Sequence, residues 1–93
     1  MEKLTDSEIQ QALSGLGGWS LEGGELVQQR TFPDFVAAIH FVNHVADLAE
    51  RAAHHPDIDI RYNRVRLALV THDAGGITAN DTAMARKIND LAG

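Results

Sequence analysis

The chain of 93 residues contains no cysteine, which excludes disulfide bonds, thiolate metal sites and cysteine nucleophiles. Only two prolines are present, and the apolar content of 44% is normal, so a folded domain is expected and not a disordered chain. Basic residues are also few, because 8 Lys and Arg stand against 13 Asp and Glu, for a formal net charge of -5. A dedicated nucleic-acid-binding protein normally carries a basic face, so this balance argues against that class.

Long apolar runs are missing as well. The first residues, MEKLTDSEI, are charged and lack the apolar core of a secretory signal, and no later run approaches membrane-spanning length. We therefore expect a soluble, cytoplasmic protein with no membrane contact. A chain of this length buries roughly 60–65% of its unfolded surface as one domain. Residues 1–93 are accordingly predicted to form a single domain.

Hydrophobic periodicity predicts three helices. Thr5 and Glu8 have the spacing of a capping box and begin the first helix, within residues 5–16. A second, longer helix is predicted over residues 34–52, and Thr78 is placed to cap a third. The second helix is expected to pack through an apolar stripe that consists of Phe35, Ile39, Val42, Val45 or Ala46, and Ala49.

Two hairpins are predicted between the helices. Gly23-Gly24 separates two short β-like runs, and alternating apolar residues after Pro56 indicate a second pair of strands. We place the second turn at Asn63-Arg64, which pairs Tyr62 with Val65. The resulting order is helix, hairpin, helix, hairpin, helix. The predicted fold class is α+β, with a four-stranded antiparallel sheet and helices packed on one face.

This pairing predicts a cluster of histidines. Extending the ladder past Pro56 places His72 beside His55, and His54 is one residue away at the end of the helix. Glu50 precedes His54 by four residues, on the last helical turn, near the same corner. Imidazoles titrate near pH 6.5, so two histidines in different environments can serve as acid and base in one reaction. The cluster is therefore a candidate proton-transfer site.

The histidines also allow two other interpretations, a solvated loop and a metal site. A His-His pair before proline is often a solvated loop, and three imidazoles can also bind Zn²⁺. Against a metal, adjacent residues on an extended chain point to opposite faces, so His54 and His55 would not easily share one ion. His40 and His44 have a chelating i, i+4 spacing, but with no third ligand in view a solvated helix face is favoured.

An ordered set of residues runs through the second half of the chain, namely Glu50, His54-His55-Pro56, Tyr62, His72 and Asp81. In order and spacing this set resembles the signature of the pterin-4a-carbinolamine dehydratases, a family also known as dimerisation cofactors of a homeodomain transcription factor. The resemblance extends over nearly the whole chain, because it also includes Gly18-Trp19, Thr71 and Gly76-Ile77-Thr78. The sequence differs from the animal members at Ala53, Val70, Asp73 and Asn80.

The resemblance implies dehydration of 4a-hydroxytetrahydropterin to quinonoid dihydropterin, without metal or organic cofactor, in support of tetrahydropterin recycling. Loss of the C4a hydroxyl needs a general acid, and loss of the N5 proton needs a base. His54, His55 and His72 match the three catalytic histidines of the family, with His54 and His72 handling protons and His55 holding the pterin, although these roles are interchangeable. The matching substrate-binding positions are Glu50, Ala53, Pro56, Val70, Thr71 and Asp73, while Tyr62 and Asp81 are structural or site-supporting.

The same resemblance implies partners. A small pterin substrate and a homo-oligomer, dimer or tetramer, are expected, with no direct binding of nucleic acid. Family members also act as coactivators or assembly factors, so a protein-binding module on the same fold is the alternative function. The intact set of three histidines favours catalysis, because a pure binding module does not need matched proton-transfer groups.

Overall fold

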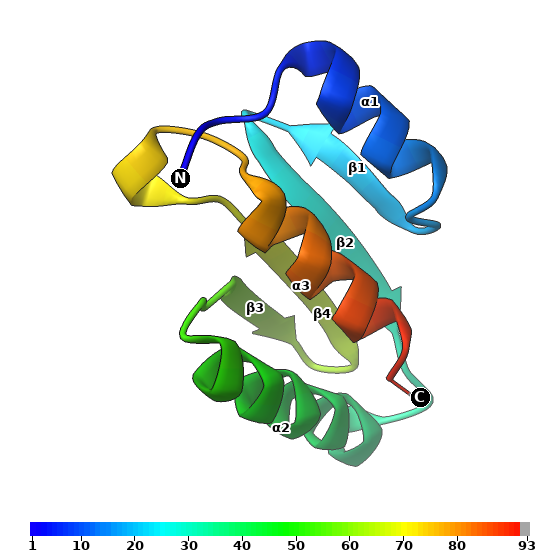
Figure 1. Cartoon of the computed structure of the whole chain (residues 1–93). Coiled ribbons are helices and arrows are strands. Elements are labelled where there is room, and N and C mark those ends of the chain that lie inside the picture. Colours follow the sequence, from blue (N-terminus) through cyan, green and yellow to red (C-terminus); the bar gives the residue numbers. More distant parts are fainter. Residues whose placement is uncertain (92–93) are drawn as a thin grey trace.

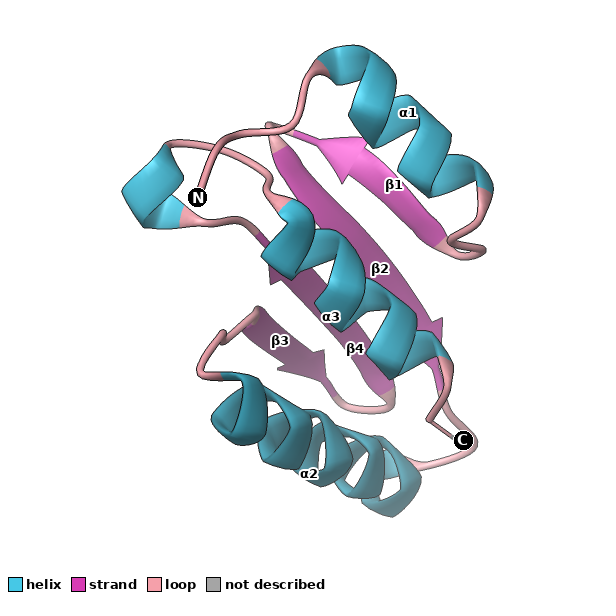
Figure 2. Ribbon diagram, in the orientation of Figure 1, coloured by secondary structure: helices cyan, strands magenta, loops and turns pink. Residues whose placement is uncertain are grey.

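The computed structural model describes residues 1–91 and contains three α-helices and a four-stranded antiparallel sheet, in the strand order β1-β2-β4-β3 (Figures 1 and 2). The fold is α+β, with the predicted alternation of helices and hairpins. No helix within residues 1–91 has the length and apolar character needed to cross a membrane. The elements are α1 (Asp6–Ser14), β1 (Trp19–Glu22), β2 (Glu25–Thr31), α2 (Phe35–Ala52), β3 (Asp57–Arg61), β4 (Arg64–Leu69), the single 3₁₀ turn His72–Ala74 and α3 (Ala79–Asn89).

The helix starts follow local sequence signals. In α1 the Glu8 backbone N–H donates to the Thr5 hydroxyl at 3.1 Å, and the Thr5 N–H donates to the Glu8 carboxylate at 2.8 Å. This reciprocal pair is the predicted capping box. Asp34 caps α2 by accepting from the Ala37 N–H at 2.8 Å. Each cap satisfies backbone donors that no preceding helical turn can reach.

The predicted apolar stripe of α2 was wrong in part. Phe35 is 48% exposed, and the core-facing residues are Ala38, Phe41, Val45 and Ala49. Phe41 determines this rotation because it packs against the Phe32 ring, with centroids 5.1 Å apart, and beneath the Arg30 guanidinium at 4.5 Å. Burial in this position lowers the pKa of the Arg30 guanidinium below its ordinary value.

One face of the sheet forms the core with the three helices. Figure 1 shows α3 running across β2 and β4, with α1 beside β1 and α2 beside β3. Trp19 is buried in this layer, and its indole N–H donates to the Asn89 side chain at 2.9 Å. Among residues 1–91, no helix lies on the opposite face of the sheet. The apolar residues that meet in the core include Ile9, Leu16, Leu26, Val65, Leu67, Leu69, Met84, Ala85 and Ile88.

The two hairpins differ in how well the sequence indicated them. Gly23 and Gly24 form the first turn as predicted, both with positive φ. The second turn is Tyr62-Asn63 and not Asn63-Arg64, because Arg61 pairs with Arg64 across it. Asn63 fixes this turn against the end of β2: its side-chain amide donates to the Phe32 carbonyl at 2.7 Å, and its own carbonyl accepts from the Phe32 N–H at 2.9 Å.

The register of β3 against β4 is therefore shifted by two residues from the prediction. Ile60 pairs with Val65 and Ile58 with Leu67, so the inward and outward faces are unchanged. The ladder ends at Asp57 and Ala68, directly after Pro56, which has no N–H to donate. The predicted strand pairing of His55 with His72 was consequently wrong.

The backbone of Tyr62 gives a testable consequence for stability. Tyr62 has φ of 53° in the left-handed region, where bulky residues are disfavoured and asparagine is tolerated. Because the ring is 67% exposed, little packing is lost on its removal. We expect Tyr62→Asn to raise the free energy of unfolding by about 0.5–1 kcal/mol in a urea titration. Tyr62→Ala is the control that removes the ring without favouring this backbone, and a gain of equal size there would contradict the explanation.

Candidate active site

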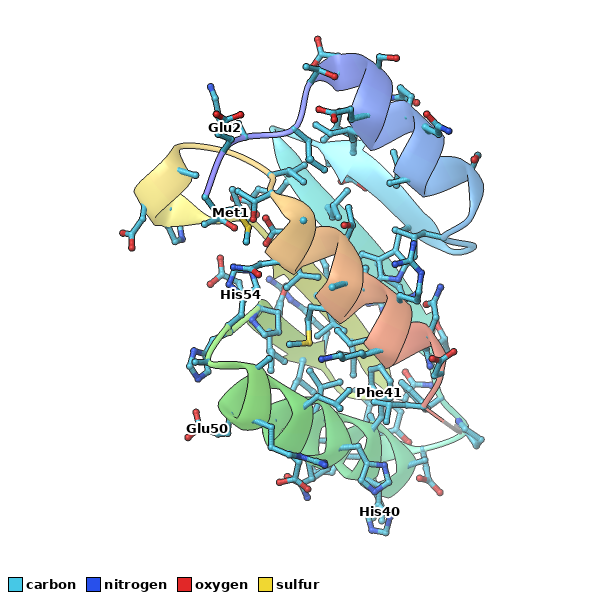
Figure 3. All side chains as sticks on the ribbon, in the orientation of Figure 1. Met1, Glu2, His40, Phe41, Glu50 and His54 are labelled. Carbon is cyan, nitrogen blue, oxygen red and sulfur yellow. The ribbon has the colours of Figure 1, made fainter. Side chains whose placement is uncertain are left out.

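The end of α2 directs two adjacent histidines to different partners. Ala53 follows the helix with φ of 51° and ψ of 38°, a left-handed conformation that reverses the chain direction. Beyond it, Nε2 of His54 lies 2.5 Å from Oδ1 of Asp81, and Nε2 of His55 lies 2.6 Å from Oε2 of Glu50. Figure 3 shows His54 between the ends of α2 and α3.

The inner pair, His54 and Asp81, is almost closed to solvent. The side chain of His54 is 14% exposed and that of Asp81 is fully buried. The second oxygen of Asp81 accepts from the Thr71 hydroxyl and from the Thr78 backbone N–H, both at 2.8 Å. The two threonine hydroxyls are also 2.8 Å apart. A buried carboxylate requires such a full set of donors. Because the donors surround both oxygens, they hold the Asp81 side chain in one orientation.

Asp81 also belongs to the start of α3. It is the third residue of the helix, and with Thr78 it forms a second capping box. A negative side chain in the first turn is favoured by the helix dipole. From the sequence, Asp81 was either a structural residue or a residue that supports the site. In the structure, its Oδ2 atom accepts from the Thr78 N–H in the capping box, and its Oδ1 atom contacts His54.

The outer pair, His55 and Glu50, is exposed to solvent. Their side chains are 60% and 78% exposed, so their contact is open to water and contributes little to stability. Glu50 thus contacts His55, whereas the sequence had suggested proximity to His54. An exposed imidazole next to a carboxylate can reorient toward a bound ligand at low cost.

His72 enters from a separate loop. It begins the 3₁₀ turn after β4, and a bridge between Thr71 and Gly76 closes this loop, with the Thr71 N–H donating to the Gly76 carbonyl at 3.0 Å. The base of the loop is joined to the N-terminal segment, where the Leu4 N–H donates to the Ile77 carbonyl at 2.8 Å. Within residues 1–91 the His72 ring makes no hydrogen bond, so its polar atoms face solvent or a ligand.

The three histidines line one solvent-open hollow of about 310 Å³. Its walls come from the end of α2 and from the segment after β4, which are joined in space although distant in sequence. Pro56 is buried and does not line this hollow, and Tyr62 lies in the turn at the far end of the β3–β4 hairpin. The lining residues are Ala53, His54, His55, Val70, Thr71, His72 and Asp73, all of which were predicted as site residues.

The geometry does not favour a metal site. Among residues 1–91, no group of three or more histidine, aspartate or glutamate side chains is arranged to hold a metal ion. His40 and His44 lie exposed along α2, and Figure 3 shows His40 on its outer side, away from the sheet. The hollow is instead suited to a small polar molecule held between imidazoles, with one imidazole fixed by a buried carboxylate.

Comparison with known proteins identifies the family of this chain. Residues 2–91 match the model of the family described as pterin 4 alpha carbinolamine dehydratase. A protein of Chloroflexus aurantiacus named "Putative pterin-4-alpha-carbinolamine dehydratase" is 56% identical over 93 residues, covering all of both chains. A protein of the same name from Acidobacterium capsulatum is 57% identical over 91 residues, covering 98% of this chain and 99% of that one.

A solved structure is similar over the same extent. The crystal structure of the transcriptional coactivator/pterin dehydratase from Brucella melitensis superimposes with a TM-score of 0.94 at 39% identity, covering 99% of this chain and 100% of that chain. Both the sequence and the fold therefore define one class, a small α+β pterin dehydratase. The chain belongs to the pterin 4 alpha carbinolamine dehydratase family.

The buried carboxylate provides a stability test. Asp81→Asn keeps the shape of the side chain but turns one acceptor into a donor that faces other donors. We expect a loss of about 2–3 kcal/mol in the free energy of unfolding, the range for a buried charged hydrogen-bond set, measured by urea titration. Glu50→Gln, in the exposed pair, is the matched control and is expected to leave the unfolding midpoint unchanged. Equal effects of the two variants would contradict the distinction between inner and outer pairs.

Proposed function

We propose that this protein dehydrates 4a-hydroxytetrahydropterin to quinonoid dihydropterin and water by histidine general acid/base catalysis, and so supports tetrahydropterin recycling. The observation that carries the proposal is that His54, His55 and His72, from two separate segments, line one hollow. Family membership supplies the substrate class. In the reaction the C4a–O bond breaks, the oxygen leaves as water, and the N5 proton is lost as the C4a–N5 double bond forms.

His54 is proposed as the base. With Asp81 as a carboxylate, the proton of the His54 ring lies on Nε2, and Nδ1 is left to accept a proton from N5. The carboxylate then stabilises the imidazolium that forms, because it is already in place and is not exposed to water. The ring orientation is fixed by the same contact, so no reorganisation is needed at the moment of proton transfer.

His72 is proposed as the acid that protonates the departing hydroxyl. Its ring has no hydrogen bond within the described residues and projects from a loop that is closed by its own bridge. His55 and Glu50 are proposed to hold the pterin, since His55 lines the hollow and Glu50, which does not line it, contacts His55. Both side chains are exposed and offer a donor and an acceptor to the polar edge of the ring system. No metal or organic cofactor is used in this scheme.

A direct assay with chemically generated carbinolamine tests the roles. We expect His72→Ala to lower kcat by a factor of about 10²–10⁴, the usual contribution of one positioned acid or base, while the circular dichroism spectrum stays unchanged. His55→Ala is expected to raise KM with kcat altered only a few-fold. His44→Ala, an exposed histidine on α2, is the control. Unchanged turnover in His72→Ala would contradict the proposed catalytic role of His72.

A homo-oligomer is proposed as the assembled form. Several large apolar residues are exposed around the β3 edge and the start of α2: Ile58 at 38%, Ile60 at 37%, Phe35 at 48% and Val36 at 61%. β3 is an edge strand with unpaired backbone groups, and such edges are normally protected or paired. A second copy of the chain would cover both features.

Light scattering measures this assembly. Ile60→Lys is expected to reduce the particle mass toward that of the single chain, because the lysine places a charge on the edge strand. Leu21→Lys is the matched control, since Leu21 is equally exposed at 37% on the strand at the other edge. A monomeric wild type, or equal dissociation in both variants, would argue against assembly through β3.

A protein-binding or coactivator role is the second candidate. It is favoured by one observation, the coactivator name of the Brucella melitensis structure with which this chain shares its fold. A pull-down that retains one stoichiometric protein partner, together with absent dehydratase activity, would support this role over catalysis. Elemental analysis after purification separately tests the third reading, a histidine metal site.

A further inference from the structure

The uncovered face of the sheet carries a concentration of arginines. Three of the eight basic residues of the chain lie within six positions of the sequence, at Arg61, Arg64 and Arg66. Arg64 pairs with Arg61 on β3, and Arg66 pairs with Asp59, so all four side chains lie on one face of the β3–β4 hairpin. The neighbouring positions Val65 and Leu67 face the helices instead. The arginine face is therefore the side of the sheet that no helix covers.

The pairing of Arg61 with Arg64 opposes folding. Directly opposed residues in an antiparallel pair have Cβ atoms about 4.5–5.5 Å apart, and like charges at such positions are destabilising. No carboxylate within residues 1–91 forms an ion pair with Arg64. The remaining neighbour of Arg64, on β2, is Thr31, which is neutral. The sheet alone gives no reason for two adjacent positive charges here.

The carboxylates nearby leave most of the guanidinium donors unused. Arg61 contacts Asp59 at 3.4 Å and Arg66 contacts Glu22 at 3.6 Å, both long contacts between exposed side chains. Asp59 stands opposite Arg66 in the ladder, yet its ion pair is with Arg61. A guanidinium has five N–H donors, so single contacts of this length occupy little of the available capacity.

A hollow of about 150 Å³ lies between these side chains and is lined by Gln29, Asp59, Arg61, Arg64 and Arg66. Three positive charges and one negative charge give this lining a net charge of +2. We propose that this hollow binds a small phosphate-type dianion, either inorganic phosphate or a phosphate monoester. Phosphate carries a charge of about -1.5 to -2 at neutral pH, and the arginine fork matches its oxygens in pairs.

The size and charge of the chain favour a small ligand over a polyanion. The net charge of -5 repels nucleic acid and anionic membranes beyond the immediate patch, and the three arginines form a spot at one hairpin end and not a stripe. The spot is also separate from the histidine hollow. Arg64 begins β4, while Val70, which lines the histidine hollow, directly follows that strand, a separation of roughly 20 Å at the usual rise per residue.

Titration with inorganic phosphate, followed by calorimetry at constant ionic strength in chloride, tests this site. Saturable one-site binding is expected for the wild type, and Arg64→Gln should weaken it by tenfold or more. Arg51→Gln removes the same charge from an exposed position on α2 and should leave the binding constant unchanged. Phosphate should also raise the Tm of the wild type and of Arg51→Gln, but not that of Arg64→Gln, because only binding to the folded state stabilises it.

Three outcomes would overturn the proposal. The first is the absence of saturable phosphate binding by the wild type. The second is equal weakening in Arg64→Gln and Arg51→Gln, which would indicate general charge screening. The third is binding of duplex DNA or of phosphatidate-containing vesicles that depends on Arg64 and occurs without any uptake of inorganic phosphate. Dehydratase turnover, measured in parallel, is expected to be the same for both variants because neither residue touches the histidine hollow.

Discussion

The fully buried carboxylate of Asp81 is the contact on which the site depends. Through its two oxygens it binds His54 after α2, Thr71 after β4 and the backbone at Thr78 before α3. Three separate segments are thus held at one point. A charge in this position is tolerated only because each donor is present, so the same requirement that keeps Asp81 stable also positions the imidazole.

Most of the fold was accessible from the sequence because its signals are local. Capping residues, the Gly23-Gly24 turn and alternating apolar residues each report on a few neighbouring positions. The two errors arose where tertiary contacts decide. Phe41 turns α2 toward Phe32 and Arg30, and Asn63 anchors the second turn one position earlier than turn propensity suggested. The β3 register shifted by two and therefore kept the correct face inward.

The sequence anticipated which residues line the hollow, but not which contacts hold them there. Family resemblance and spacing brought together the residues that line the hollow, yet the pairing argument that joined His55 to His72 did not hold. The structure uses a left-handed residue at Ala53 and a carboxylate 27 positions beyond His54 in place of a continuous ladder. Thr78, predicted from the sequence as a helix cap, also donates its backbone N–H to that carboxylate.

Asp81 both begins α3 and contacts His54, so its retention in a related protein would not by itself indicate catalysis. A related protein that lost the chemistry and kept only a binding role would still need the Asp81 carboxylate to begin α3, and His54 as the partner of its Oδ1 atom. Selection for folding alone would retain both. Folding places no such requirement on the solvent-exposed His55 and His72, so under the proposed mechanism the retention of these two residues distinguishes an active dehydratase from a binding scaffold.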